Sequence, residues 1–344
     1  MLGDCNPDVL VLGDDVTPAF GQQEKLVGSI AMVIGGSAAI TAVAAARLGL
    51  RVALVAAVGA DPSGAFMLDQ LAAEGVDVSA VAVRDGTPTG MTVALSQGGD
   101  RAILTALGAM ASLTTADVPG ALLARARHVH ASSYFLLEGS LGPGLAGLLS
   151  AARAAGATTS LDTNWDPSGR WGDERLSAAI AQADVLLPNE AEALRLAGRL
   201  AGRLAGRLAG RLAGVGLSGA ASLDAAAGTL TAAGPKLVVK LGKRGVLCAD
   251  GPVRHWVSLP PVALVDATGA GDCFNAGLIA GLLGGLPLPQ AAALGCAAGA
   301  LSTGAPGGTA SAPDMPAAAQ LAALASVTSV ALPGHGHRVT LLPA

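Results

Sequence analysis

Two aspartates, Asp266 and Asp272, lie on either side of a turn made of small residues. Three of those residues, Gly269, Ala270 and Gly271, let backbone N–H groups approach a ligand closely, because their side chains are absent or small. A helix that begins near Asp272 would add its dipole to those N–H groups and so create a site for an anion. A carboxylate beside an anion site predicts a general base that deprotonates a hydroxyl group next to a phosphate.

Two long stretches without charge, residues 27–46 and 273–313, need an explanation. By length alone either would qualify as a membrane span. Glycine pairs interrupt both stretches, and prolines also interrupt the second. We therefore interpret both as buried elements of a soluble protein and expect no membrane partner. The acids among residues 1–15, with no basic residue there, also argue against a signal peptide.

The segment 266–277, DATGAGDCFNAG, resembles the signature of the ribokinase or PfkB-type carbohydrate kinases. The resemblance extends over nearly the whole chain and implies one domain, residues 1–344. Its fold would be α/β, a ribokinase-like three-layer sandwich with a mostly parallel central sheet and a small β-strand lid. The implied activity is ATP- and Mg²⁺-dependent transfer of the γ-phosphoryl group to a hydroxymethyl group of a sugar or sugar-like substrate. Asp272 would be the catalytic base, and the N–H groups of Gly269, Ala270 and Gly271 would neutralise charge on the transferred group.

The pattern of elements agrees with that fold. Apolar, β-branched runs predict strands at 51–58, 126–131, 158–161, 184–187 and 236–241. Alanine-rich runs predict helices at 39–48, 64–74, 144–155, 176–183 and 220–233. Such alternation favours a mostly parallel sheet covered by helices on both faces, with ligands at the carboxyl ends of the strands. Segments 9–33 and 83–107 predict antiparallel strands of a lid, with ordinary edge hairpins as the alternative.

The acceptor site is expected near the N-terminus. Gly35 and Gly36 allow backbone contact with a polyol, and the family has a Gly-Gly motif at this place. In the family the substrate aspartate ends the first core strand at a set distance before that motif, and the resemblance therefore implies Asp8, with Asn6 beside it, for the sugar hydroxyls. Asp14 and Asp15 lie too close to the motif in sequence. If Asp8 is the contact, the first core strand must begin almost at Met1.

Further residues of the site separate one kind of sugar from another. Many ribokinases follow the glycine pair with a lysine and an asparagine, but this chain has Ser37 and Ile40, which argues against a ribose-type contact set. Asp162 and Asn164 follow a predicted strand and match a family pattern for sugar contacts. Asp166 stands where that pattern has an arginine, and this loss of positive charge argues against an acidic sugar such as a ketodeoxygluconate.

The phosphate side of the site comes from two other turns. Asn189 and Glu192 are three residues apart at a strand-to-helix junction, and their oxygens suit Mg²⁺-bound water and phosphates. The alternative is simple N-capping of a helix. A glycine-rich basic turn follows another strand, as a phosphate contact would require. The resemblance places nucleotide contacts on Lys240, Gly242, Gly245 and, in the adenine pocket, Cys296.

A potassium site is also implied by the resemblance. The glycine-rich loop 302–311 matches the family's monovalent-cation loop in length. Backbone carbonyls would supply most of the ligands. The predicted set is Asp266, Thr268, Ser302, Ala305, Gly307 and Ser311. His128 and His130 alternate along a strand with no third ligand near them in sequence, so a zinc site is not expected.

The segment 195–214 repeats RLAG five times. As a helix it would span about 30 Å, with its arginines forming a slowly drifting basic ridge. Each glycine costs about 1 kcal/mol relative to alanine in a helix, so the helix would be marginal on its own. We interpret the repeat as an insertion on the surface, and a docking stripe for an acidic partner is the alternative.

Composition limits the remaining functions. The net charge is −4, which disfavours nucleic acid as a partner. Four scattered cysteines predict reduced thiols in a cytoplasmic protein. The alternative enzyme is a nucleoside kinase on the same scaffold, which the scarcity of aromatic residues slightly disfavours. The alternative from another class is a non-catalytic sugar or nucleotide sensor, and the presence of Asp272, Asn189 and Glu192 argues against it. Open edges of the lid strands suggest a homodimer.

Overall fold

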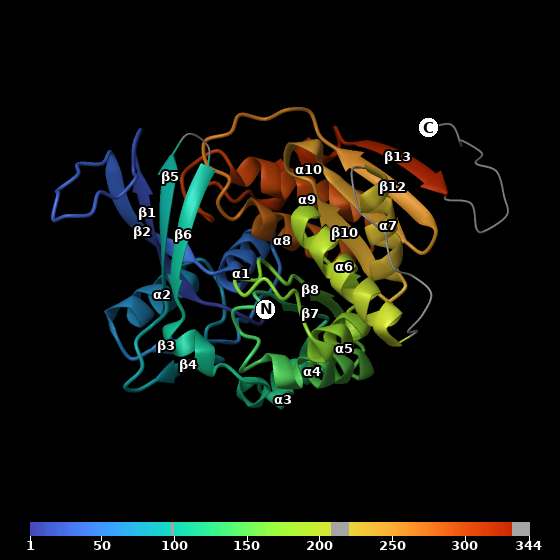
Figure 1. Ribbon diagram of the computed structural model, residues 1–344, viewed down its shortest axis with the longest axis horizontal. Coiled ribbons are helices and arrows are strands. Elements are labelled where there is room, and N and C mark those ends of the chain that lie inside the picture. The colour runs from blue at the N-terminus through green and yellow to red at the C-terminus, as the bar shows by residue number, and fades with distance from the viewer. Residues whose placement is uncertain (98–99, 208–219, 332–344) are drawn as a thin grey trace.

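The computed structural model describes residues 1–97, 100–207 and 220–331 (Figure 1). Its central sheet has seven strands in the order β13-β12-β11-β10-β9-β8-β7. Their bounds are β7 His128–Ala131, β8 Thr158–Leu161, β9 Val185–Leu186, β10 Lys236–Lys240, β11 Val246–Asp250, β12 Val253–Ser258 and β13 Ser326–Ala331. Strands β7 to β10 are parallel, whereas β11, β12 and β13 continue the sheet antiparallel.

The sheet continues beyond β7 through the start of the chain. Leu2 forms parallel bridges to Ala131 and to Val55, and the next strands are β3 (Ala56–Gly59) and β4 (Val81–Arg84), also parallel. The first core element therefore does begin next to Met1, as the choice of Asp8 required.

Helices cover both faces of this sheet, which gives the three-layer α/β fold expected from the sequence (Figure 1). One layer contains α4 (Gly142–Ala154), α5 (Glu174–Gln182), α6 (Glu190–Arg207) and α7 (Ala220–Thr231). The other contains α1 (Ser37–Arg47), α2 (Pro62–Ala73), α8 (Ala270–Leu283), α9 (Leu288–Ser302) and α10 (Met315–Ala322). A short helix, α3 (Gly120–Arg125), precedes β7.

Close helix packing replaces large side chains in the second layer. A Cβ atom on Gly277 would lie 2.7 Å from the Leu294 carbonyl oxygen, and one on Gly281 would lie 2.8 Å from Cα of Ala291. Helices α8 and α9 therefore touch through their backbones, which a larger residue at these positions would prevent. The apolar stretch 273–313 is accounted for by these two helices and the loop after them.

A separate four-stranded sheet lies at one side of the molecule, as Figure 1 shows on the left. It has the order β2-β1-β5-β6, with bounds β1 Asn6–Leu12, β2 Ser29–Gly35, β5 Met91–Gln97 and β6 Asp100–Ala106. Both segments predicted for the lid contribute strands to this sheet, which we call the lid sheet. The strands are not all antiparallel, because β1 pairs with β5 in parallel. Val83 belongs instead to β4, which pairs with β3 in a two-stranded sheet.

The first units of the RLAG repeat lie in a helix at the surface. Helix α6 begins at Glu190 and carries the repeat onward to Arg207. Leu196 and Ala197 are buried against the core, whereas Arg195, Gly198 and Arg199 are exposed, so the helix has one buried face, and an insertion at the surface stays a prediction. The repeat from residue 208 to 214 lies outside the described residues.

Two further expectations can be compared with the described part of the chain. None of its helices combines the length and apolar character needed to cross a membrane. All four cysteines are free thiols.

Candidate active site

The turn before α8 holds Asp272 at the carboxyl end of the central sheet. Gly269 adopts a left-handed conformation with φ of 71°, and a Cβ atom there would lie 2.5 Å from Cα of Gly308, so only glycine fits. The N–H group of Ala270 donates to the carbonyl of Ala267 at 3.2 Å. The predicted role of Ala270 as a phosphate donor therefore requires this hydrogen bond to be shared or to open. Gly271 and Asp272 occupy the first turn of α8.

Asp272 is partly buried and binds the hydroxyl group of Ser37, a residue at which this chain departs from the ribokinase pattern. The Ser37 hydroxyl donates to Oδ1 of Asp272 at 2.7 Å. Loss of water around the carboxyl group raises the pKa of Asp272 to about 8, and the nearby Asp162 and Asp4 charges add to this. The hydrogen bond from Ser37 and the positive charge of Lys240 act in the opposite direction and lower it.

Lys240 forms an ion pair with Asp162 beside the first turn of α8. The ammonium group also contacts Oδ1 of Asn275 at 3.4 Å, and Asn275 donates to Oδ2 of Asp162 at 2.7 Å. A Cβ atom on Gly271 would lie 3.6 Å from Nζ of Lys240. The lysine therefore lies next to the expected anion site rather than pointing away along the nucleotide turn.

Asp162, which was predicted to contact the acceptor, binds neighbouring protein groups in the structure. Its side chain is 1% exposed, pairs with Lys240 and accepts a hydrogen bond from Asn275. These contacts fix the position of Lys240, and a direct contact between Asp162 and the acceptor stays a prediction.

Asn189 and Glu192 form a reciprocal capping pair at the start of α6. The Asn189 N–H group donates to Glu192 Oε2 at 2.8 Å, and the Glu192 N–H group donates to Asn189 Oδ1 at 2.9 Å. The N-capping alternative is thus realised. Burial and the charge of Asp162 raise the pKa of Glu192 to about 7, against the opposing effect of Lys240.

The predicted acceptor residues meet where the lid sheet joins α1. Asp8 is buried, its Oδ1 accepts a hydrogen bond from Asn6 at 3.1 Å, and it lies so close to Gly35 that a Cβ atom there would be 1.9 Å from Oδ1. Gly36 has φ of 84°, and a Cβ atom on it would lie 3.1 Å from Oδ1 of Asn6. Burial and the Asp4 charge raise the pKa of Asp8 to about 7.

The two alternative aspartates, Asp14 and Asp15, lie in exposed positions, unlike Asp8. Asp14 and Asp15 are exposed in the turn that follows β1, and Asp15 pairs with Lys25. Asn164 does reach the site, because its Nδ2 donates to the Ser37 hydroxyl at 2.8 Å. The geometry therefore favours Asp8 and Asn164 over Asp14 as acceptor contacts.

Two further polar residues at this junction were missed. Asp4 accepts hydrogen bonds from the N–H groups of Ser37 at 3.0 Å and Ala38 at 2.9 Å, and so caps α1. Asn275 lies within the quoted signature but was given no role. The only sequence signal for a role of Asn275 was its position three residues after the base. The structure places it on the buried face of α8.

Part of the predicted cation loop is assembled. Asp266 accepts hydrogen bonds from the N–H group of Gly307 at 2.8 Å and from the hydroxyl of Thr268 at 2.8 Å. Burial opposes ionisation of Asp266, but these hydrogen bonds outweigh it and lower its pKa. The Ser302 hydroxyl instead donates to the Gly299 carbonyl at 2.9 Å, inside α9. Ala305 and Ser311 lie in the loop between α9 and α10.

A lid residue reaches this loop as well. Arg101 on β6 donates from Nη1 to the Thr268 hydroxyl at 2.9 Å, and its charge also lowers the pKa of Asp8 and of Asp266 against the larger effect of burial. The lid is thereby connected to the turn that holds the base. No motif in the sequence around Arg101 indicates this contact.

The nucleotide turn has structural requirements of its own. Gly245 has φ of 87°, and a Cβ atom there would lie 2.0 Å from the Val257 carbonyl oxygen. Gly242 has φ of 59° with open space around it. Cys296 is half-buried on α9 and packs against the apolar cluster that includes Cys248 and Phe274. Gly245 is thus needed by the fold whether or not a nucleotide contacts it.

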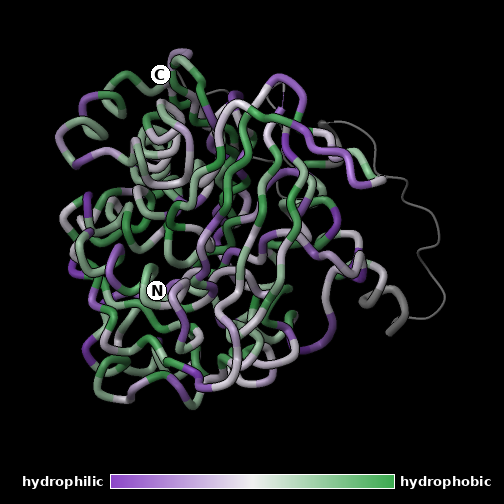
Figure 2. Tube along the Cα trace, turned by 90° about the vertical axis from the view of Figure 1, so that its left-hand side faces the viewer, coloured by the Kyte–Doolittle hydropathy of each residue, from purple (hydrophilic) through white to green (hydrophobic). Residues whose placement is uncertain are grey.

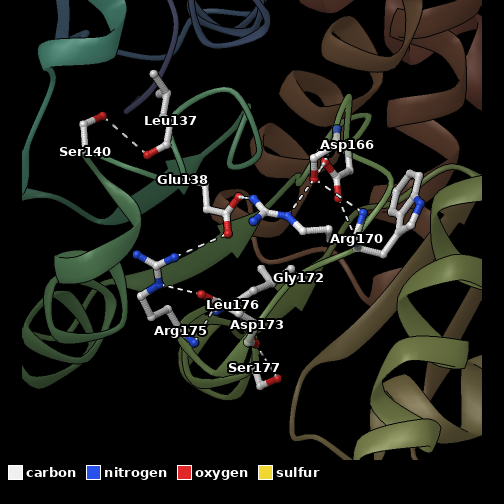
Figure 3. A network of polar contacts seen from close by, with 12 residues as sticks. Leu137, Glu138, Ser140, Asp166, Arg170, Gly172, Asp173, Arg175, Leu176 and Ser177 are labelled. Carbon is white, nitrogen blue, oxygen red and sulfur yellow. Dashed lines mark hydrogen bonds and ion pairs between the residues drawn. The ribbon is translucent and has the colours of Figure 1, made fainter.

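The loop after β8 is fixed by aromatic and ionic contacts, part of which Figure 3 shows. Trp171 packs edge-on against Trp165 with ring centroids 5.0 Å apart. The guanidinium of Arg195, the first arginine of the RLAG repeat, lies 5.0 Å and 5.3 Å from the centroids of these two rings. Arg170 pairs with Glu138 at 2.9 Å, on the segment after β7 (Figure 3). The loop that carries Asn164 is therefore anchored from two sides.

Asp166 has a local role in the same loop. It accepts hydrogen bonds from both the N–H group and the hydroxyl of Ser168. Its carboxylate is buried, and it also accepts from the N–H group of Trp171 at 2.5 Å. The residue that replaces the family's arginine thus shapes the loop.

Comparison with known proteins identifies the family. Residues 6–315 match the pfkB family of carbohydrate kinases. The chain belongs to this family. Among the relatives of this pfkB-family kinase, a fructokinase of Klebsiella pneumoniae is 33% identical over 317 residues, which cover 88% of this chain and 95% of the relative. A 2-dehydro-3-deoxygluconokinase of Bacillus subtilis is 30% identical and covers 82% of this chain and 84% of the relative.

Solved structures show the same fold. A ribokinase II of Escherichia coli in complex with ATP and Mg²⁺ aligns with a TM-score of 0.75 over 93% of this chain and 97% of its own, at 22% identity. The ribokinase-like architecture expected from the signature is thereby confirmed. The described residues of this pfkB-family kinase contain no group of three or more His, Cys, Asp or Glu side chains arranged to hold a metal ion.

Proposed function

We propose that this sugar kinase transfers the γ-phosphoryl group of ATP to a hydroxymethyl group of a sugar or sugar-like acceptor, with Asp272 as the base. The observation that carries the proposal is the position of Asp272 at the N-terminus of α8. Its carboxylate is in contact with Ser37, which directly follows the Gly35-Gly36 pair. The base thus lies between a helix N-terminus suited to an anion and the junction that contains Gly35 and Gly36.

Each group of the site has a separate role in phosphoryl transfer. Asp272 accepts the proton of the acceptor hydroxyl as its oxygen attacks the phosphorus atom. The first turn of α8 and the ammonium group of Lys240 stabilise negative charge on the transferred group. Asp8, Asn6 and Asn164, together with the backbone at Gly35-Gly36, orient the acceptor so that transfer is in line. This division follows from the contacts described above.

The surroundings of Glu192 suit a divalent cation next to the phosphates. The raised pKa of its carboxyl group reflects burial and the neighbouring Asp162 charge, and a cation there would relieve both. Carboxylate and amide oxygens are ligands that Mg²⁺ accepts, usually through water. Asn189 and Glu192 would hold Mg²⁺ in this way, and when bound it would neutralise charge on the phosphate oxygens. The Escherichia coli neighbour was solved in complex with ATP and Mg²⁺, which supports ATP and Mg²⁺ as the cofactors of this chain.

A neutral polyol is the acceptor that we favour over an acidic sugar. The carboxylate of Asp166 accepts hydrogen bonds within its own loop. Arg170, the next arginine in the sequence, already forms an ion pair with Glu138. The acceptor junction itself presents Asp8 and Asn6. A carboxylate on the substrate would meet the negative charge of Asp8. The fructokinase relative is consistent with this choice, whereas the 2-dehydro-3-deoxygluconokinase relative is named for an acidic sugar, so the substrate screen must include both classes.

The lid sheet is the surface on which we expect a second copy of the chain to bind. Apolar side chains are exposed on the lid strands, namely Ile30, Met32, Ile103 and Leu104, and Figure 2, in which the lid faces the viewer, shows hydrophobic stretches along these strands. We infer that a second copy pairs there.

Potassium at the Asp266 loop is a separate inference, supported by the short contacts of Asp266 with Thr268 and Gly307.

The test is a phosphorylation screen of neutral sugars, acidic sugars and nucleosides with ATP and Mg²⁺, with and without potassium. We expect transfer to a neutral polyol with a free hydroxymethyl group. Transfer to nucleosides alone would support the nucleoside-kinase alternative. ATP binding with no transfer to any acceptor would support a sensor.

A further inference from the structure

Three consecutive hydrogen bonds connect a main-chain N–H group to the carboxylate of Asp272. The Ser133 N–H group donates to Asn164 Oδ1 at 2.7 Å. Asn164 Nδ2 donates to the Ser37 hydroxyl at 2.8 Å, and that hydroxyl donates to Asp272 Oδ1 at 2.7 Å. The four residues come from the loops after β7 and β8 and from the first turns of α1 and α8. We call this arrangement the Ser37 relay.

The chemistry of each group fixes the direction of the relay. A backbone N–H group can only donate, so the amide oxygen of Asn164 must face Ser133 and its NH₂ group must face Ser37. An NH₂ group can also only donate, so the Ser37 oxygen accepts there. Its single hydrogen is then left for Asp272, whose ionised form is the better acceptor.

Backbone strain shows that the relay is imposed by the fold. Ser133 and Asn164 both have positive φ angles, 56° and 55°. Non-glycine residues in this region cost on the order of 1 kcal/mol or more and persist only where surrounding contacts determine them. The N–H group of Asn164 also donates to Asp162 Oδ1 at 3.2 Å, which holds the strained turn from its other side. Asn164 is therefore fixed at both its backbone and its side chain.

We propose that Ser37 is a positioning residue for the base: its hydroxyl, oriented by Asn164, holds one carboxylate oxygen of Asp272, favours the ionised carboxylate and leaves the other oxygen for the acceptor. This inference rests on the proposed function, in which Asp272 is the base. It also gives a function to the serine that directly follows the Gly35-Gly36 pair.

The electrostatics of the site make such a device useful. Burial, Asp162 and Asp4 all raise the pKa of Asp272, so that the carboxyl group would hold a proton near neutral pH. A protonated carboxyl group cannot accept the proton of an acceptor hydroxyl. The Ser37 hydrogen bond opposes this rise, and without it a smaller share of the molecules would carry a competent base.

The direct test measures protonation of Asp272 without any acceptor. Protein labelled with [4-¹³C]aspartate is titrated by NMR, and the Asp272 signal is assigned by its absence in Asp272→Asn. We expect Ser37→Ala to raise the titration midpoint of Asp272 by about one pH unit, the effect of losing one hydrogen bond to a charged group. Ser37→Ala keeps the backbone N–H group that caps α1 through Asp4, so the helix stays in place.

Two variants serve as controls. Thr41→Val removes another hydroxyl from the same helix, one that is buried and has no hydrogen-bond partner, and it should leave the midpoint unchanged. Ser37→Thr restores a hydroxyl and should restore most of the wild-type midpoint. Asn164→Ala frees the Ser37 hydroxyl to rotate and should raise the midpoint as well.

Kinetics then test the consequence for catalysis. In Ser37→Ala the acid limb of kcat/KM should move up by the same amount as the NMR midpoint, with kcat/KM about tenfold lower on that limb. Ser37→Ala combined with Asn164→Ala should be no worse than Ser37→Ala alone, because both act through one hydrogen bond. An unchanged midpoint in Ser37→Ala, as in Thr41→Val, overturns the inference. A shifted midpoint with normal turnover in Asp272→Asn would instead refute the proposed base and leave the relay intact.

Discussion

The ammonium group of Lys240 and the carboxylate of Asp162 form an ion pair across the short strand β9, although 78 positions separate them in sequence. Both groups are almost enclosed, with side chains 15% and 1% exposed. The pair brings a positive charge to the first turn of α8 while keeping the charge compensated. The site therefore has a cation of its own next to the expected phosphoryl position.

Removing the lysine should cost both stability and activity. Lys240→Met leaves Asp162 buried without its counter-charge, and we expect a loss of about 3 kcal/mol in the free energy of unfolding. Chemical denaturation measures this directly. Lys243→Met, on an exposed lysine in the same turn, is the matched control and should be neutral. If the double variant Asp162→Asn with Lys240→Met is as unstable as Lys240→Met alone, the buried charge is not the cause.

Much of the fold was predictable because its signals are local. The strand at 158–161 and the helices near 64–74 and 144–155 were found to within a few residues, since β-branched runs and alanine-rich runs differ in composition. The loop that carries Asn164 was located by its place after a strand. These signals depend on neighbours in the sequence alone.

The contacts that define the site were not predictable in the same way. The hydrogen bond between Ser37 and Asp272 joins residues 235 positions apart, and no local pattern reports it. Asp162 was placed on the correct edge of the sheet, yet its ion pair with Lys240, 78 positions away, could not be inferred from its neighbours in the sequence. Arg195 lies in a repeat that suggested a surface stripe, and the two tryptophans that it contacts precede it in a separate loop.

The pH dependence of stability should report the unusual pKa of Asp272. Its pKa in the folded protein, about 8, lies above the value in an unfolded chain, so between these values the folded state holds a proton that the unfolded state has released. Unfolding then releases protons, and this group's contribution to stability falls as pH rises toward 8. Asp272→Asn should remove that fall.

The measurement is the difference in unfolding free energy between wild type and Asp272→Asn from pH 6 to 8.5. We expect the variant to gain relative to wild type by up to about 1.4 kcal/mol per pH unit. The histidines His128 and His130, whose pKa values are lowered by burial to about 3, are common to both proteins and cancel in the difference. A difference that does not change with pH would show that Asp272 is already ionised throughout this range.

Arg195 should matter more than its place in a repeat suggests. Arg195→Ala removes a cation that lies over both Trp165 and Trp171, which we expect to cost about 0.5–1 kcal/mol in stability. Because these rings belong to the loop that carries Asn164, the KM for the acceptor should rise a few-fold while ATP affinity stays unchanged. Arg51→Ala, at an exposed position outside the loop, is the control. Equal KM values in the two variants would mean that the repeat does not support the acceptor loop.

The central claim is that Asp272 removes the proton from the acceptor hydroxyl, and the most direct measurement is turnover by Asp272→Asn. The substitution keeps the shape of the side chain and its contact with Ser37 but removes the base. We expect kcat to fall by at least about 10²-fold, the low end for loss of a general base, while calorimetry shows ATP binding unchanged. Turnover within a few-fold of wild type, with the same acceptor, would contradict the account.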